Sequence, residues 1–135
     1  MGAVVSSSLP LEEVRQRYGE STPRRQFLFA RLQTVARLLL ATGKLRHLYL
    51  FGSFTTAKPT PGDLDCLAVM AAGFTTMNLT SPHLDVFQHD TCRLRYQTDV
   101  FWVTEAVAQE HLTAMFDVFS RNRDGAPQSI IEVTV

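Results

Sequence analysis

The stretch LYLFGSFTTAKPTPGDLDCLAVM, residues 48–70, decides how this chain folds. It opens on an apolar run, which predicts a buried strand over residues 46–51. Gly52-Ser53 ends that run, and a polar loop with two prolines and a lysine follows. The segment Asp63-Leu64-Asp65 then leads into a second apolar run, which predicts a strand over residues 64–70. We expect the two strands to pair antiparallel across the loop.

Two carboxylates lie at the start of the second strand. Asp63 and Asp65 are two residues apart, so in a strand they project from the same face, while Leu64 points into the core. Neighbouring carboxylates repel and raise each other's pKa unless a cation lies between them. Mg²⁺ commonly binds one or two carboxylates together with substrate phosphates. The pair therefore predicts a magnesium site, and the alternative is that Asp63 belongs to the Pro-Gly-Asp turn and Asp65 is a solvated edge residue.

The turn before the loop carries features of a phosphate site. Gly52 lets a ligand approach the backbone closely, and Ser53 adds a hydroxyl next to exposed N–H groups that form an anion-binding concavity. Thr55, Thr56 and Lys58 follow as further candidate phosphate ligands. Alternatively, Gly52-Ser53 is an ordinary turn, the two threonines only cap it, and Lys58 is solvated.

A third candidate acid lies in QTDVFWV, residues 97–103, which predicts a strand over residues 98–103. Asp99 shares a strand face with Phe101 and Val103. Because aspartate is depleted in strands, its presence here indicates a partner or a metal ion. The alternative is a strand-end aspartate that bonds a neighbouring N–H.

These residues together resemble a known signature. Gly52-Ser53, followed after nine residues by Asp63-Leu64-Asp65 and later by Asp99, resembles the nucleotidyltransferase superfamily, which has the polymerase-beta-like fold. GSFTTAKPTPGDLDCLAV, residues 52–69, and the tail FSRNRDGAPQSIIEV, residues 119–133, are also similar to a small group of stand-alone bacterial nucleotidyltransferase-like proteins of uncharacterised function. The resemblance extends from about Arg24 to the C-terminus.

The resemblance implies an α/β (α+β) fold with a mixed sheet flanked by helices. It implies Mg²⁺-dependent transfer of a nucleoside monophosphate from an NTP, with ATP the first choice, to a hydroxyl of a protein, an RNA or a small molecule. The phosphates would lie over Gly52-Ser53, and Asp63 and Asp65 would hold Mg²⁺. Asp99 would complete a second metal position and help to deprotonate the acceptor, since two metals about 3.5–4 Å apart serve an in-line displacement.

Two other functions are associated with features of this sequence. A haloacid-dehalogenase-type phosphatase also uses Asp-x-Asp, but there the pair follows a buried strand, whereas here the apolar run follows the pair. The order argues against a phosphatase. The stronger alternative is a catalytically weak or inactive binding module of this fold, such as one half of a toxin–antitoxin pair with a partner toxin or antitoxin. Failure to bind Mg-NTP would favour the module.

Composition bounds the class of protein. The 135 residues suit one domain, 1–135, and 45% apolar with 19% charged residues indicates a globular chain. A formal net charge of zero argues against broad electrostatic attraction to nucleic acid or membranes. No apolar run reaches the roughly 20 residues of a membrane span, and the N-terminus does not read as a signal peptide. Two cysteines are too few for a disulfide framework, so we expect a cytoplasmic protein.

The remaining elements are predicted from caps and periodicity. Residues 1–20 read as an N-terminal extension whose first eight residues are frayed, with Ser8 capping a short helix over 10–17. Further helices are expected over residues 23–42, 82–89 and 105–119. A final strand over residues 130–135 is expected at a sheet edge, where it would support a homodimer. Arg24 and Arg25 are candidates to reach a phosphate, and Arg123 to project toward the active face, although arginines on a helix more often form a solvated face.

Overall fold

The computed structural model describes residues 5, 7–121 and 128–135. Its centre is a five-stranded mixed sheet in the order β1-β5-β2-β3-β4. The pairs β1–β5 and β3–β4 are parallel, and β2 runs antiparallel to both of its neighbours. The predicted mixed sheet and the antiparallel pairing of the two strands around the central loop are therefore confirmed. The strands are β1 (Ser7–Pro10), β2 (Leu45–Phe51), β3 (Leu64–Met70), β4 (Thr98–Thr104) and β5 (Ile131–Thr134).

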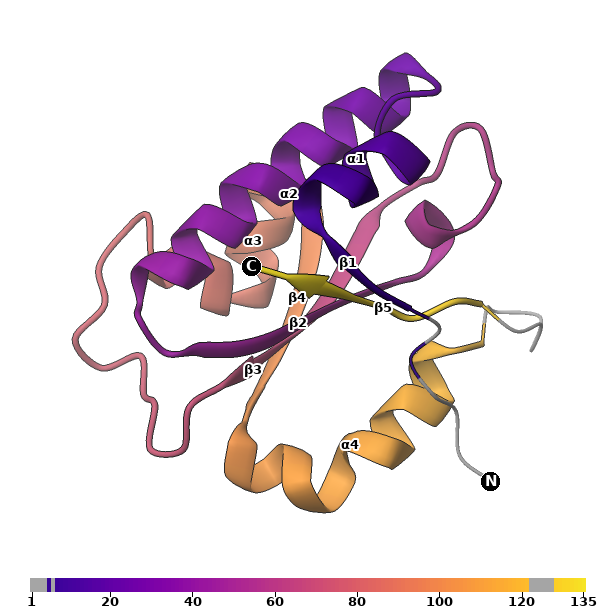
Figure 1. Ribbon diagram of the computed structural model, residues 1–135. Helices are drawn as coiled ribbons and strands as arrows, with labels where there is room; N and C mark the ends of the chain where they lie inside the picture. The colour runs from indigo at the N-terminus through magenta and orange to yellow at the C-terminus, as the bar shows by residue number, and fades with distance from the viewer. Residues whose placement is uncertain (1–4, 6, 122–127) are drawn as a thin grey trace.

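Helices cover both faces of this sheet, as Figure 1 shows. The long helix α2 crosses one face together with α1 and α3, and α4 lies on the opposite face. The helices are α1 (Leu11–Tyr18), α2 (Pro23–Ala41), α3 (His89–Tyr96) and α4 (Glu105–Phe119), with the 3₁₀ turns η1 (Ser53–Thr55) and η2 (Leu84–Phe87). The start of α2 follows the predicted chemistry, because the Thr22 hydroxyl accepts the backbone N–H of Arg25 and Pro23 is the first helical residue.

The central strands are buried on both faces, which is why they read as continuous apolar runs. In β2, Leu48 and Leu50 pack in the core beneath α2, while Tyr49 and Phe51 pack toward α4. The same alternation in β3 places Leu64, Cys66, Ala68 and Met70 in the first core and Leu67 and Val69 in the second. Asp65 therefore lies on the α4 face of the sheet.

The N-terminal prediction is wrong in one respect. Ser7 and Ser8 are not frayed but begin β1, which pairs in parallel with β5. Leu9 is the one buried residue of this four-residue strand, so no alternation was available to reveal it. The short helix α1 lies where the sequence predicted it, although Pro10 rather than Ser8 is its N-cap residue.

The segment between β3 and β4 also differs from the prediction. The helix expected over residues 82–89 is only the 3₁₀ turn η2, and the true helix, α3, begins at His89. Residues 93–96, just before β4, form its last turn. Only Cys92 of α3 is buried, so its sequence, HDTCRLRY, carries too weak an apolar stripe to announce a helix.

The terminal strand does not lie at an edge. β5 is hydrogen-bonded to β1 on one side and to β2 on the other, so it offers no free edge for the homodimer contact expected there. The edges of the sheet in the described part of the chain are β1 and β4. Arg123 lies outside the described residues.

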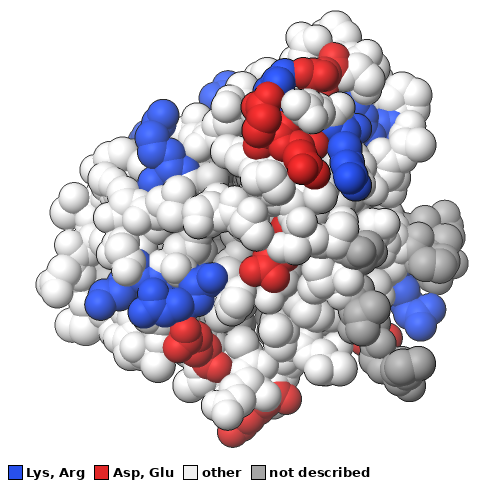
Figure 2. Space-filling model, viewed as in Figure 1, with Lys and Arg blue, Asp and Glu red and all other residues white. Residues whose placement is uncertain are grey.

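The surface carries charges of both signs in small groups. Figure 2 shows acidic and basic side chains adjoining over α1, where Arg15 pairs with Glu12 and Glu20, and uncharged surface around them. This view shows no broad surface of a single sign, in keeping with the zero net charge. Within the described residues, none of the helices has the length and apolarity that a membrane crossing requires.

Candidate active site

Two carboxylates meet on neighbouring parallel strands. The register of β3 and β4 places Asp65 directly opposite Asp99, and both side chains project from the α4 face of the sheet. Asp99 is only 7% exposed. Burial raises the pKa of Asp65 to about 7, and the charge of Asp99 beside it adds to the rise. The pair is therefore costly to ionise together and is stabilised by a cation.

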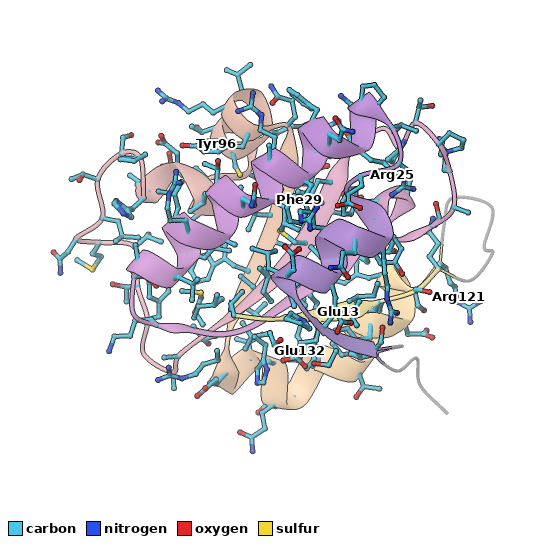
Figure 3. All side chains as sticks on the ribbon, turned by 45° about the horizontal axis from the view of Figure 1, so that its top comes forward. Glu13, Arg25, Phe29, Tyr96, Arg121 and Glu132 are labelled. Carbon is cyan, nitrogen blue, oxygen red and sulfur yellow. The ribbon has the colours of Figure 1, made fainter. Side chains whose placement is uncertain are left out.

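A cleft of about 840 Å³ opens in front of Asp65. Its polar wall comes from the turn after β2 and from the start of β3, and its apolar wall comes from Phe51, Phe101 and the end of α4. Arg121, labelled in Figure 3 beyond the end of α4, lies at its rim. Of the residues predicted from sequence, the cleft is lined by Gly52, Ser53, Thr56, Lys58, Asp63 and Asp65.

The glycine of the turn is required by its backbone and by its neighbour. Gly52 has φ +81°, which L-residues with a side chain rarely adopt. A Cβ atom there would lie 2.3 Å from Oδ2 of Asp65. The turn and the carboxylate are therefore in close approach.

Two side chains of α3 hold Asp99 in place. Nε2 of His89 lies 3.0 Å from Oδ1 of Asp99, and Nη1 of Arg93 lies 3.3 Å from both of its carboxylate oxygens. Nη2 of Arg93 also lies 3.9 Å from Oδ2 of Asp63, which is half exposed at the mouth of the cleft. Sequence reasoning missed both residues because it missed α3. Their spacing of four places them on one helix face, but only once the helix is recognised.

Thr55 is placed away from the cleft. Its hydroxyl lies 3.0 Å from the carbonyl oxygen of Gly52 and 2.9 Å from that of Ser129, and the residue is buried. The structure thus favours the alternative that Thr55 fixes the turn rather than binding phosphate. Thr56 also donates its hydroxyl locally, to the carbonyl of Ser53, but it remains at the cleft wall.

Arg25 organises the loop instead of reaching a phosphate. The guanidinium is buried at the start of α2 and donates to the carbonyl oxygens of Tyr18, Phe54, Thr56 and Lys58, at 2.6–3.2 Å. Figure 3 shows its side chain beside this loop. Burial lowers the pKa of Arg25. Arg24 donates in the same manner to the carbonyls of Pro61 and Gly62.

The donor set suits a hard divalent cation. Carboxylate oxygens are the ligands that Mg²⁺ prefers, and Asp65 and Asp99 present theirs side by side. Nevertheless, no three His, Cys, Asp or Glu side chains within residues 7–121 and 128–135 are grouped as a complete metal site. Asp63, the third predicted ligand, is instead near Arg93. The residues fit a cation held by two carboxylates and completed by substrate phosphate oxygens.

The fold and the cleft define a mixed α/β domain with an acidic pocket at the ends of its central strands. The chain belongs to the family of unknown function DUF6932, whose model matches residues 6–134. Comparison with curated proteins gives no match. Among solved structures, the chain is similar to a "putative nucleotidyltransferase from Sulfolobus solfataricus", with 16% identity, a TM-score of 0.40, and coverage of 87% of this chain and 91% of that one.

Proposed function

We propose that this protein is an Mg²⁺-dependent nucleotidyltransferase that moves a nucleoside monophosphate from an NTP to a hydroxyl group. The observation that carries the proposal is the juxtaposition of Asp65 and Asp99, on one sheet face and beside the Gly52 turn. The adjoining cleft, at about 840 Å³, falls within the roughly 300–1,000 Å³ typical of small-molecule sites.

The turn and loop supply the phosphate-binding part of the site. Gly52 has no side chain, so phosphate oxygens can approach the backbone there, and Ser53 contributes a hydroxyl. Lys58 lies on the same wall and adds a positive charge for the triphosphate. Arg121 adds a second one at the rim.

The carboxylates require a cation before a triphosphate can bind beside them, because phosphate and carboxylate charges repel. Asp65 and Asp99 would hold Mg²⁺, with Asp63 as the third ligand once a nucleotide is present. The bound ion would neutralise the phosphate oxygens and activate the acceptor hydroxyl. ATP is the first NTP to test.

The transfer is a single displacement at the α-phosphorus. The acceptor oxygen forms a bond to that phosphorus while the bond to the bridging oxygen of the β-phosphate breaks, and pyrophosphate leaves. The hydroxyl proton passes to the carboxylate of Asp99. His89 and Arg93 hold that carboxylate in a fixed orientation.

The proposal is tested by incubating the protein with ATP, GTP, CTP or UTP, each labelled at the α-phosphate, together with Mg²⁺, cell lysate and RNA. We expect wild type to label at least one acceptor, and Asp63→Ala and Asp65→Ala to abolish the label while the fold persists. If wild type and both variants behave alike in every lane, the proposal that the protein is an enzyme is refuted. Circular dichroism confirms that each variant is folded.

A binding module is the second candidate, as half of a toxin–antitoxin pair. It is favoured by the pairing of Asp99 with Arg93, which supplies a positive charge to the carboxylate without a metal ion. A module of this kind would gain thermal stability from its partner but would transfer no label with any NTP. Co-purification with a partner protein, in the absence of transfer, would support it.

A further inference from the structure

A second, apolar pocket of about 390 Å³ lies beside the acidic cleft, at the open edge of the sheet. It is bounded by η2 and the first residue of α3 on one side, by the edge strand β4, and by the end of α4 on the other. Its lining residues are Phe87, His89, Val100, Phe101, Trp102, Met115 and Phe119. Five of these seven side chains are aromatic rings, counting the imidazole of His89.

The two pockets share a wall. Phe101 and Phe119 line both of them, and their ring centroids lie 5.6 Å apart. Phe119 also stacks on Phe51, on the side of the cleft, at 4.2 Å and an interplanar angle of 16°. A ligand in one pocket is therefore separated from a ligand in the other by a single layer of rings.

The charges divide the two pockets by the chemistry of their occupants. The acidic cleft holds Lys58 and Arg121, which suit phosphate, together with its two aspartates. The apolar pocket has no Lys, Arg, Asp or Glu among its lining residues in the described part of the chain. Phosphate groups therefore belong in the cleft, and a flat apolar ring, which stacks on aromatic side chains, belongs in the pocket.

His89 connects the pocket to the carboxylates. Its ring lines the pocket, with its centroid 5.6 Å from that of Phe101, and its Nε2 lies 3.0 Å from Oδ1 of Asp99. His89 therefore joins the lining of the pocket to Asp99, the carboxylate proposed to take the proton of the attacking hydroxyl.

We propose that this pocket binds the acceptor of the transfer reaction, a small molecule whose reacting hydroxyl is attached to, or lies a few bonds from, a flat aromatic ring. The role of the bound molecule as an acceptor rests on the proposed function, whereas the binding of an aromatic ring in the pocket does not depend on it. Two sources share this chemistry, a nucleoside and a phenol, and the experiment separates them.

Binding can be followed by intrinsic fluorescence, because Trp102 is the only tryptophan of the sequence and lines the pocket. We would titrate the full-length protein with adenosine, N-acetyl-tyrosinamide and, as a non-aromatic control, N-acetyl-leucinamide, and follow tryptophan fluorescence. We expect saturable quenching by one or both aromatic compounds, at least tenfold tighter than any response to the leucine compound. Equal responses, or none, would overturn the proposal.

Variants of α4 localise the binding. Met115→Arg places a long charged side chain in the pocket and should weaken binding at least tenfold, and Met115→Phe fills the space without a charge and should weaken it as well. Val107→Arg is the matched control, since Val107 is exposed on the same helix and lines neither pocket. Its affinity should stay within twofold of wild type, and an equal loss in Val107→Arg would overturn the assignment.

A final titration separates the acceptor from the nucleotide. An ATP analogue with a methylene group between its α- and β-phosphates is added to saturation with Mg²⁺, and the titration is repeated. Unchanged affinity for the ring compound supports an acceptor pocket. A tenfold loss of affinity assigns the pocket to the base of the NTP and overturns the proposal. If the aromatic compound binds but no nucleoside monophosphate is transferred from any NTP, the proposed function is refuted and the aromatic binding site is still supported.

Discussion

Gly52 and Asp65 are in such close approach that a methyl group on residue 52 would lie 2.3 Å from Oδ2 of the carboxylate. Gly52 directly follows the last residue of β2, and Asp65 is the second residue of β3. The antiparallel pairing of Phe51 with Asp65 brings them together. The turn is thereby fixed against the carboxylate of Asp65.

Replacing this glycine tests whether the close approach matters for function. Gly52→Ala should reduce nucleotide transfer by about 100-fold or more, because Asp65 must move from its position. It should also lower the free energy of unfolding by about 1–3 kcal/mol, because alanine is strained at this backbone conformation. Labelled-NTP assays and denaturant unfolding measure the two effects.

Gly43→Ala is the matched control. Gly43 also has a positive φ, of +69°, but a Cβ atom there meets nothing within 4 Å. The Gly43→Ala variant should lose about 1–2 kcal/mol of stability and keep its transfer activity. Loss of activity in both variants would show that backbone strain, rather than the contact with Asp65, is responsible.

The raised pKa of Asp65 predicts a dependence of stability on pH. The unfolded chain releases this proton near the ordinary value of 3.8 and the folded chain near 7, so between these values the folded state holds more protons. The contribution of Asp65 to the free energy of unfolding therefore falls as pH rises from about 4 to 7, by at most about 4 kcal/mol. Asp65→Asn should remove this fall and be more stable than wild type at pH 8 without divalent ions.

The measurement is the difference in unfolding free energy between wild type and Asp65→Asn from pH 4 to pH 8. The difference reports the titration of Asp65 together with its effect on the neighbouring Asp99, because titrating groups far from this pair cancel. Glu110→Gln serves as the control, since Glu110 lies on the exposed face of α4 and lines neither pocket. A pH-independent difference would show that Asp65 ionises normally.

Binding of a divalent cation gives the next expectation. A ligand that binds only the folded state raises its stability, and Mg²⁺ would also relieve the repulsion between Asp65 and Asp99. At pH 8, millimolar Mg²⁺ should raise the melting temperature of wild type and of Glu110→Gln. Asp65→Asn and Asp99→Asn should show little or no shift, and a shift as large as that of wild type would place the ion elsewhere.

The sequence was informative where a strong local pattern coincided with burial. Continuous apolar runs located β2 and β3, and Thr22 with Pro23 located the start of α2. The alternation of Asp63, Leu64 and Asp65 set the carboxylates on one face of the sheet, with Leu64 fully buried on the other. That Asp65 meets Asp99 depended on a parallel register, which a single sequence does not encode in any local pattern.

The parts that escaped prediction are short or polar. β1 has four residues, and α3 buries only Cys92, so neither carries a usable period. Because α3 was not predicted, His89 and Arg93 were missed as well, together with the contacts that they make with Asp99. The role of Arg25 was equally hidden, because its partners are backbone carbonyls, and carbonyls have no signature in sequence.

Arg93 is the resident counter-charge of the acidic cluster. Arg93→Gln removes the cation that lies 3.3 Å from Asp99 and 3.9 Å from Asp63, so the carboxylates should repel more strongly. We expect a lower melting temperature at pH 8 without metal and a larger rise on adding Mg²⁺ than in wild type. Arg93→Lys keeps the charge and should lie between the two, and an unchanged metal response in Arg93→Gln would contradict the counter-charge role.

Arg25 is predicted to stabilise the site without touching the substrate. Its guanidinium donates to four backbone carbonyls around the loop that carries Thr56 and Lys58, and the side chain is 3% exposed. Arg25→Gln should lower the free energy of unfolding by about 2–4 kcal/mol, because buried carbonyls lose charged donors. Transfer activity should fall with it, through a higher KM for the NTP, since Lys58 is no longer held at the cleft.

Arg24→Gln, which removes donors to the more exposed end of the same loop, should cost about 1 kcal/mol or less. Steady-state kinetics at a temperature well below both melting transitions distinguish the cases, and an unchanged KM in folded Arg25→Gln would show that the loop keeps its shape without this anchor.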